Sequence, residues 1–130
     1  MSKPFHLALP AGNLEITKKF YTEILECTLG NKEEGKWVDI DFWGNELTLH
    51  QTDLKLPRER HGVDMGNVPI PHFGVHLDKE VFDRIKSNLK SNNIKYIDKP
   101  YTRFEGTKFE QNTFFIEDPN GNVLELKTFE

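Results

Sequence analysis

The sequence lacks the features that mark secreted and membrane proteins. Its 130 residues contain a single cysteine, Cys27, so no disulfide can form within the chain. No segment approaches the roughly 18 consecutive apolar residues that cross a membrane as a helix. The opening residues, Met-Ser-Lys-Pro, are not followed by the apolar run of about 7–15 residues that a signal peptide needs. We therefore expect a cytoplasmic protein without a membrane partner.

An excess of positive charge is also missing. The formal net charge is −4 at pH 7, the pI is about 5.7, and Lys and Arg never gather into a long stripe. This composition argues against a nucleic-acid partner. Hydrophobic residues make up 36% and charged residues 29% of the chain, which is ordinary for a globular protein. A chain of this length can form one domain or two small units that share a core.

The first half of the chain has the pattern of a strand, a helix and three more strands. The strands are expected at 5–9, 28–33, 37–42 and 46–51, and the helix at 14–27. Pro10 ends the first strand, and Asn13 is suited to cap the helix. In that helix Ile16, Phe20 and Ile24 recur every four residues and predict the buried stripe.

The same order of elements returns after a connection at 52–71, which is rich in charges and proline. Strands are expected at 72–77, 94–97, 112–117 and 122–128, with a helix between Asp78 and Asn92 and a polar loop at 98–111. The segment Asp118-Pro119-Asn120-Gly121 is a strong turn signal between the last two strands.

The two halves also share local sequence, which predicts an internal repeat. His6-Leu-Ala-Leu matches His72-Phe-Gly-Val, and Trp43-Gly-Asn-Glu-Leu-Thr-Leu matches Asn120-Gly-Asn-Val-Leu-Glu-Leu. One half alone cannot bury the face of its sheet, so each half requires a partner. We expect a single α+β domain over residues 1–130, built from two βαβββ modules at 5–51 and 72–128. The modules would form one cup-shaped mixed sheet with the helices outside.

The repeat also predicts a metal site. His6 and His72 occupy equivalent positions, and Glu125 is equivalent to Thr48 on the last strand of each half. Equivalent positions should face the same cup. Two imidazoles and one carboxylate form a set that holds a divalent metal and leaves positions open for a substrate.

Each of these residues also has an ordinary interpretation. A histidine at the start of a strand is usually solvated or hydrogen-bonded, and a glutamate between two leucines is usually the wet face of an amphipathic strand. Only about one such histidine in ten would be expected to bind a metal. Their coincidence at repeat-related positions favours the triad of His6, His72 and Glu125.

These motifs resemble the vicinal oxygen chelate superfamily, which includes glyoxalase I, fosfomycin-modifying enzymes, bleomycin-resistance proteins and extradiol dioxygenases. The resemblance covers nearly the whole chain and is most specific in Asp118-Pro-Asn-Gly-Asn-Val-Leu-Glu125. It implies His6, His72 and Glu125 as metal ligands and a homodimer as the assembly. Glyoxalase I uses a fourth ligand, a glutamate late in the first half, where this chain has Thr48. The local sequences around Trp37 and Arg103 are most similar to those of small proteins described as extradiol-type dioxygenases.

Four further residues are candidates for the site. His50 should share the face of Thr48 and is predicted to act as a catalytic acid–base group, although a wet histidine at a strand end is about equally plausible. Arg103, Tyr101 and Glu110 lie on or near the long second-half loop and are predicted to bind substrate, with Arg103 holding an anionic group. The alternative for this loop is a solvated charged segment.

The sequence therefore predicts a metal-dependent enzyme that binds two vicinal oxygens of a small substrate, of the extradiol dioxygenase type. Fe(II) is the favoured cofactor, and Mn, Ni or Zn are alternatives because a His2Glu set accepts several divalent ions. Two other functions stay open. One is a metal-dependent lyase, isomerase or thiol transferase of the glyoxalase type, and the other is a non-catalytic resistance module that binds a small molecule.

Overall fold

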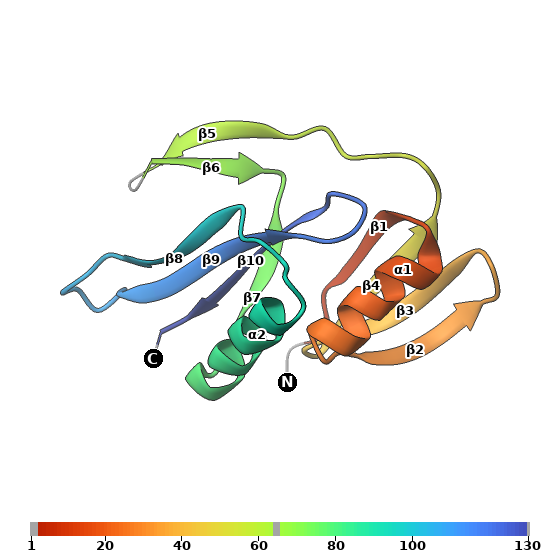
Figure 1. The fold of residues 1–130 in the computed structure, drawn as a ribbon, viewed down its shortest axis with the longest axis horizontal. Coiled ribbons are helices and arrows are strands. Elements are labelled where there is room, and N and C mark those ends of the chain that lie inside the picture. The colour runs from red at the N-terminus through yellow and green to blue at the C-terminus, as the bar shows by residue number, and fades with distance from the viewer. Residues whose placement is uncertain (1–2, 64–65, 130) are drawn as a thin grey trace. The chain divides into compact units, whose positions relative to one another are not determined.

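The computed structural model describes residues 3–63 and 66–129 and divides into two compact units (Figure 1). Unit 1 comprises Met1–Leu56 and Asp118–Asn122. Unit 2 comprises Pro57–Glu117 and Val123–Glu130. Over the described residues, no helix combines the length and the apolar character that a membrane crossing requires.

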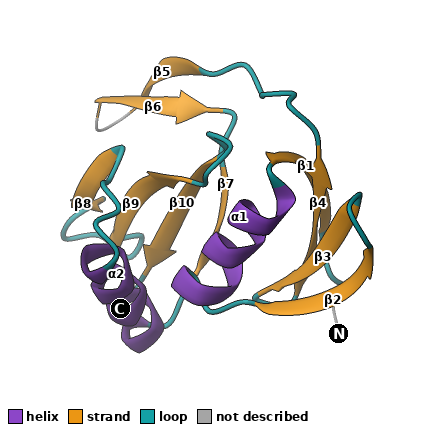
Figure 2. Cartoon of the chain, turned by 45° about the vertical axis from the view of Figure 1, so that its right-hand side comes forward, coloured by secondary structure: helices purple, strands orange, loops and turns teal. Residues whose placement is uncertain are grey.

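Unit 1 contains one mixed four-stranded sheet with a helix (Figure 2). Its elements are β1 (His6–Gly12), α1 (Leu14–Lys19), the π-helical segment η1 (Phe20–Ile24), β2 (Thr28–Glu33), β3 (Trp37–Phe42) and β4 (Asn45–Gln51). The strand order is β1-β4-β3-β2. The pair β1–β4 is parallel, and the other pairs are antiparallel.

Unit 2 repeats this arrangement and adds a hairpin. Its elements are β5 (Glu59–Val63), β6 (Gly66–Ile70), β7 (Phe73–His76), α2 (Lys79–Ser91), β8 (Asp98–Arg103), β9 (Gln111–Glu117) and β10 (Val123–Thr128). The main sheet has the order β7-β10-β9-β8, and β5 and β6 pair separately. Again the first pair is parallel and the next two are antiparallel.

The repeat extends to the register of the strands. In unit 1 Ala8 pairs with Thr48, and in unit 2 Gly74 pairs with Glu125. Both pairs follow from aligning His6 with His72, so the predicted equivalence of Thr48 and Glu125 is correct. The prediction of an α+β fold with two βαβββ modules is confirmed.

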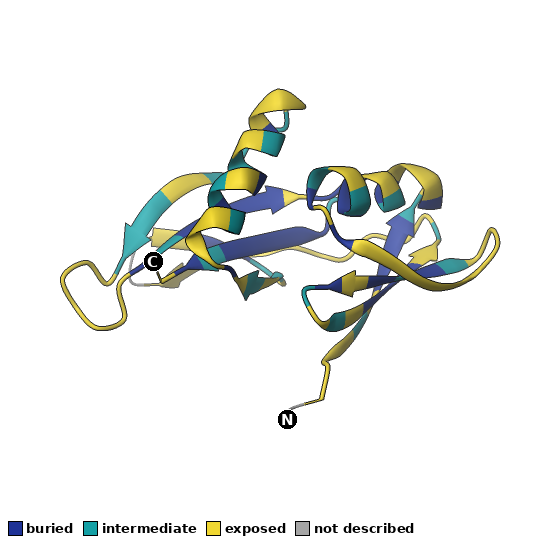
Figure 3. Ribbon diagram, turned by 90° about the horizontal axis from the view of Figure 1, so that it is seen from below, coloured by how far each residue is buried: buried dark blue, intermediate teal, exposed yellow. Residues whose placement is uncertain are grey.

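Each sheet buries one face beneath its helix. In unit 2 the helix α2 contributes Phe82, Ile85 and Leu89, which lie on one side of the helix while the other side is exposed (Figure 3). The sheet contributes alternating apolar residues, among them Phe114, Ile116, Leu124 and Leu126. Burial of each large apolar side chain stabilises the fold by roughly 1.5–3 kcal/mol. We call the opposite face of each sheet, which points away from its helix, the polar face.

The first helix differs from the prediction. The Asn13 side chain accepts a hydrogen bond from the Ile16 amide at 3.1 Å, so the predicted cap is correct. However, α1 ends at Lys19 and continues as η1, whose wider turn rotates the later residues around the axis. Tyr21 and Leu25 are fully buried, whereas Ile16, which lies before η1, is 57% exposed, so its predicted place in the buried stripe is wrong.

The prediction of a strand at 94–97 is wrong. The structure has β8 at Asp98–Arg103 instead, inside the segment predicted as a polar loop, and the loop covers only residues 104–110. Pro100 concealed this strand, because a proline lacks the amide hydrogen that a central strand needs. β8 lies at the edge of its sheet, where a proline is tolerated.

Two other segments contain more structure than expected. β1 does not stop at Pro10 but continues to Gly12 through an irregularity in its pairing with β4. The connection at 52–71 holds the hairpin β5–β6, in which Val68 is buried against Phe115 and Val123. This hairpin therefore covers part of the polar face of the unit 2 sheet.

The predicted turn between β9 and β10 belongs to unit 1 and is held by a buried network. Oδ1 of Asp118 accepts the amides of Asn120 at 2.9 Å and Asn122 at 3.0 Å, as the turn signal predicts. Oδ2 of Asp118 accepts the hydroxyl of Tyr21 at 2.8 Å. Burial raises the pKa of Asp118, against the opposing effect of these hydrogen bonds.

Candidate metal centre

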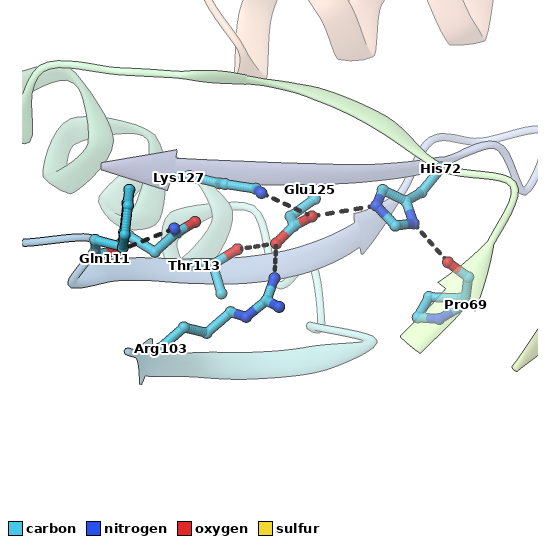
Figure 4. A network of polar contacts seen from close by, with 8 residues as sticks. Pro69, His72, Arg103, Gln111, Thr113, Glu125 and Lys127 are labelled. Atoms are coloured by element: carbon cyan, nitrogen blue, oxygen red, sulfur yellow. Dashed lines mark hydrogen bonds and ion pairs between the residues drawn. The ribbon is translucent and has the colours of Figure 1, made fainter. Parts of the chain in front are cut away.

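The centre of unit 2's polar face is a histidine–glutamate pair. Nε2 of His72 lies 3.2 Å from Oε1 of Glu125 (Figure 4). On the other side of the ring, Nδ1 lies 2.6 Å from the carbonyl oxygen of Pro69, and the ring packs edge-on against Phe115. The imidazole is therefore fixed in orientation by a contact on each side and by a third from the aromatic ring.

The carbonyl of Pro69 determines which nitrogen of His72 is available. A carbonyl oxygen only accepts, so Nδ1 must donate its hydrogen to Pro69. In the neutral ring Nε2 then carries a lone pair, and it faces the carboxylate of Glu125, which is also an acceptor. A proton or a cation between Nε2 and Oε1 would satisfy both atoms. The hydrogen bond with Glu125 raises the pKa of His72, although partial burial of the ring lowers it, and the Pro69 carbonyl adds to the rise.

Glu125 owes its position to the alternation of β10. Its neighbours Leu124 and Leu126 point into the core under α2, so its own side chain points to the polar face. The residue is only 3% exposed. Oε2 accepts the hydroxyl of Thr113 at 2.6 Å. Burial favours a higher pKa for Glu125, but the hydrogen bonds from His72 and Thr113 and the charge of Lys127 outweigh it, so its pKa is lowered.

Two cations flank this carboxylate. Nζ of Lys127 lies 3.6 Å from Oε1 of Glu125, and a guanidinium nitrogen of Arg103 lies 4.0 Å from Oε2. Lys127 comes from β10 and Arg103 from β8 (Figure 4). The carboxylate is thus surrounded by one imidazole, one hydroxyl and two cationic groups.

The equivalent face of unit 1 carries polar residues as well. Nδ1 of His6 lies 2.7 Å from a carboxylate oxygen of Glu46, and both side chains are more than half exposed. The hydroxyl of Thr48 donates to Asp39 at 2.7 Å. His50 is exposed, and its strand parity gives it the same face as Thr48.

The predicted site residues divide between the units. Unit 2 brings together His72, Glu125 and Arg103, and Tyr101 packs on the same face against the Val68, Phe115 and Val123 cluster. His6 and His50 belong to unit 1, so their roles in the site stay predictions. Across the described parts of the chain, no three His, Cys, Asp or Glu side chains are grouped as a metal site.

Glu110 lies in the loop between β8 and β9 and holds that loop through its side chain. Its carboxylate accepts the amide of Gly106 at 2.8 Å and so closes its own loop. That loop begins only at residue 104, after the unpredicted strand β8, so it is shorter than the loop predicted at 98–111. Glu110 therefore closes a short turn. Substrate binding by Glu110 stays an untested prediction.

Four residues of the centre were not singled out from the sequence. Lys127 and Thr113 could have been found from alternation along β10 and β9, since both share the face of Glu125. Pro69 could not, because the sequence predicts only a connection between the halves at 52–71. Gln111 is 7% exposed, and its side-chain oxygen has no hydrogen-bond partner in the described structure. It pairs directly with Arg103 across the strands.

Comparison with known proteins agrees with this fold. Residues 3–126 match the family described as the glyoxalase/bleomycin resistance protein/dioxygenase superfamily. The match spans nearly all of the chain, including both repeat halves and the Asp118-to-Glu125 segment. The protein therefore belongs to this superfamily.

Solved structures give the same answer. A glyoxalase/bleomycin resistance protein/dioxygenase from Alicyclobacillus acidocaldarius is 34% identical, covers 99% of this chain and 93% of its own, and has a TM-score of 0.76. A fosfomycin resistance protein from Listeria monocytogenes has a TM-score of 0.75 at 15% identity, covering 100% and 95%. A lactoylglutathione lyase from Agrobacterium tumefaciens has a TM-score of 0.68 at 18% identity, covering 99% and 95%. The last two show a shared fold only. No curated protein matched the chain.

Proposed function

We propose that this protein is a metal-dependent enzyme that binds two vicinal oxygens of a small substrate. The ligands would be His72, Glu125 and His6, the repeat equivalent of His72. The observation that carries the proposal is the pairing of His72 with Glu125. A buried carboxylate faces the lone-pair nitrogen of an imidazole whose other nitrogen is held by Pro69.

The chemistry of these residues fits a divalent ion. Imidazole nitrogen and carboxylate oxygen are the ligands that Fe, Mn, Ni and Zn accept. Metal-bound histidines usually donate their second ring hydrogen to a carbonyl or carboxylate, as His72 does to Pro69. Thr113 restrains the carboxylate of Glu125 in the same way. When bound, the ion would supply Lewis acidity or, if it is iron, the capacity to react with oxygen.

We favour an extradiol-type dioxygenase with Fe(II) as the reaction class. Three protein ligands would leave positions for two substrate oxygens and for O2. A glyoxalase-type site would use a fourth carboxylate where this chain has Thr48, whose hydroxyl is engaged with Asp39. On the substrate side, Arg103 and Tyr101 would orient the substrate from β8, and His50 would move a proton at a substrate oxygen.

The test is reconstitution with Fe(II) without oxygen, followed by air and a panel of catechols. Oxygen uptake with a yellow ring-cleavage product supports the dioxygenase. If Mn, Ni or Zn restores turnover of another substrate without oxygen uptake, a lyase, isomerase or thiol transferase is correct instead. Tight ligand binding without turnover under any metal indicates a binding module. Sedimentation analysis in the same buffer would test the expected homodimer.

A further inference from the structure

The β5–β6 hairpin supplies one of the two groups that hold the His72 ring apart from Glu125. Pro69 of β6 presents its carbonyl oxygen to Nδ1 of His72 at 2.6 Å (Figure 4). The other group is Phe115 of β9, whose ring meets the imidazole edge-on with the centroids 5.0 Å apart. Because β5 and β6 form a sheet of their own, the orientation of His72 depends on how the hairpin is held against the main sheet of unit 2.

One arginine joins the strands that carry these two supports. Arg60 of β5 lies directly opposite Pro69 in the hairpin. Its Nη1 lies 2.8 Å from the carbonyl oxygen of Asn67 on β6 and 3.2 Å from each carboxylate oxygen of Asp98 on β8. Asp98 in turn lies directly opposite Phe115 in the pairing of β8 with β9. The Arg60–Asp98 contact therefore connects the strand position beside Pro69 with the strand position beside Phe115.

The apolar contacts of the hairpin do not fix its position by themselves. Val68 of β6 is buried with Phe115 and Val123, which holds the hairpin on the sheet. Hydrophobic burial is non-directional, whereas the hydrogen bonds of Arg60 require a particular distance and angle. The side chains of Arg60 and Asp98 are 45% and 27% exposed, so their ion pair adds little to overall stability. Its place in the structure points instead to a role in geometry.

We propose that Arg60 is a positioning residue for His72, acting through the hairpin and the carbonyl of Pro69. By holding β6 against β8, Arg60 keeps the Pro69 oxygen within reach of Nδ1. The hydrogen on Nδ1 then leaves the lone pair of Nε2 on the side of Glu125, where a metal would bind. Without the Arg60–Asp98 contact the neutral ring divides between its two tautomers. This inference rests on the proposed function for the metal, but the state of the ring is measurable without one.

The first measurement is made on the His72 ring in the metal-free protein. At alkaline pH, where the ring is neutral, nitrogen NMR distinguishes the ring nitrogen that carries a hydrogen from the one with a lone pair. We expect the hydrogen on Nδ1 in the wild type. In Arg60→Gln the shifts of the two nitrogens should move toward each other as the tautomers mix. Arg60→Lys keeps a charged donor and should restore most of the wild-type difference. Unchanged shifts in Arg60→Gln would overturn the proposal.

The second measurement is calorimetric titration with Zn²⁺ alone. Arg60→Gln and Asp98→Asn should each lower the affinity about tenfold, the lower end of the range for groups that orient a metal ligand. The double variant should bind no more weakly than either single variant, because both changes remove the same contact. Lys79→Gln is the matched control, since it removes an equal charge and a 2.8 Å ion pair with Asp83 on α2.

The outcomes separate positioning from mere packing. A lower unfolding free energy of Arg60→Gln with unchanged ring shifts and unchanged Zn²⁺ affinity would mean that the hairpin only covers the sheet, and the positioning role would be refuted. If the wild-type protein binds no Zn²⁺, the proposed function fails, and the ring shifts of Arg60→Gln still decide whether Arg60 positions His72.

Discussion

Gly74 lies directly opposite Glu125 in the parallel pair of β7 and β10, closer than any side chain would allow. A Cβ atom at position 74 would overlap the carbonyl group of Glu125. The absent side chain therefore lets β7 approach the strand that carries the buried carboxylate. The equivalent residue in unit 1 is Ala8, opposite Thr48, so the close approach is particular to unit 2.

We predict that Gly74→Ala displaces the backbone of Glu125. The overlap is with backbone atoms, which cannot move aside as a flexible side chain can. The cost should be about 1–3 kcal/mol of unfolding free energy, together with weaker metal binding. Urea unfolding and metal analysis measure the two effects. Gly62→Ala is the control, because a Cβ there meets only the Asn67 side chain at 3.4 Å. Wild-type metal affinity in Gly74→Ala would refute the proposed link to Glu125.

A second prediction concerns the hydroxyl that restrains Glu125. Thr113→Val keeps the shape of the side chain but removes the 2.6 Å hydrogen bond to Oε2. Since that bond lowers the pKa of Glu125, the pKa should rise, and metal affinity should fall about 10- to 100-fold. Calorimetric metal titration provides the measurement. Thr102→Val is the control, because it removes a similar bond to Asn112 away from Glu125. An equal effect of both variants would count against Thr113.

The Tyr21–Asp118 bond should stabilise unit 1. Tyr21→Phe removes the hydroxyl that Asp118 accepts and leaves a buried carboxylate with one donor fewer. We expect a loss of about 1–3 kcal/mol in unfolding free energy, measured by urea denaturation. Tyr96→Phe, in a half-buried ring that packs against Phe114, should change stability much less. If the two variants are equally stable, the buried hydrogen bond contributes nothing measurable.

His50 is predicted to act on the substrate and not on the metal. His50→Ala should lower turnover at least about 100-fold, the lower range for a general acid or base, and leave metal content unchanged. Activity and metal analysis of the same sample distinguish the possibilities. Equal loss of metal would make His50 a ligand, and an unchanged rate would make it a solvated surface residue. His61→Ala is the control, because His61 is exposed and lies beside Glu59.

The sequence was sufficient to predict the repeat and the position of Glu125. Both depend on short-range patterns: a period of two along each strand, Asn13 before the helix, and similar short sequences at equivalent places in the two halves. Glu125 stands between two leucines, so its face follows from alternation alone. These local patterns predict the structure correctly because the sheets are amphipathic, with one face under a helix.

The features that the sequence did not predict depend on pairing partners. β8 contains Pro100 and becomes a strand only because β9 lies beside it. The close approach of Gly74 to Glu125 and the hydrogen bond that His72 donates to the Pro69 carbonyl depend on strand pairing and a hairpin that the local pattern does not reveal. These two contacts therefore had to come from the three-dimensional structure.

The last prediction is the pH dependence of the His72–Glu125 pair. Because the folded-state pKa of His72 is raised, its contribution to apoprotein stability is fully present below the unfolded value of about 6.5. It is lost as the pH rises through the folded value. The pKa of Glu125 is lowered, so its contribution is present above about 4.3 and is lost as the pH falls through its folded value.

Metal affinity should change with pH in the opposite direction to the stability that His72 contributes. The ion requires the neutral imidazole and releases its proton, so metal affinity should rise with pH up to the folded pKa of His72 and then level off. Glu125→Gln removes the main cause of the raised pKa, and the pKa of His72 should fall in the apoprotein. NMR titration of the His72 ring measures this shift, and calorimetry at several pH values measures the affinity. A His72 pKa that is the same in both proteins would show that Glu125 does not interact with the ring.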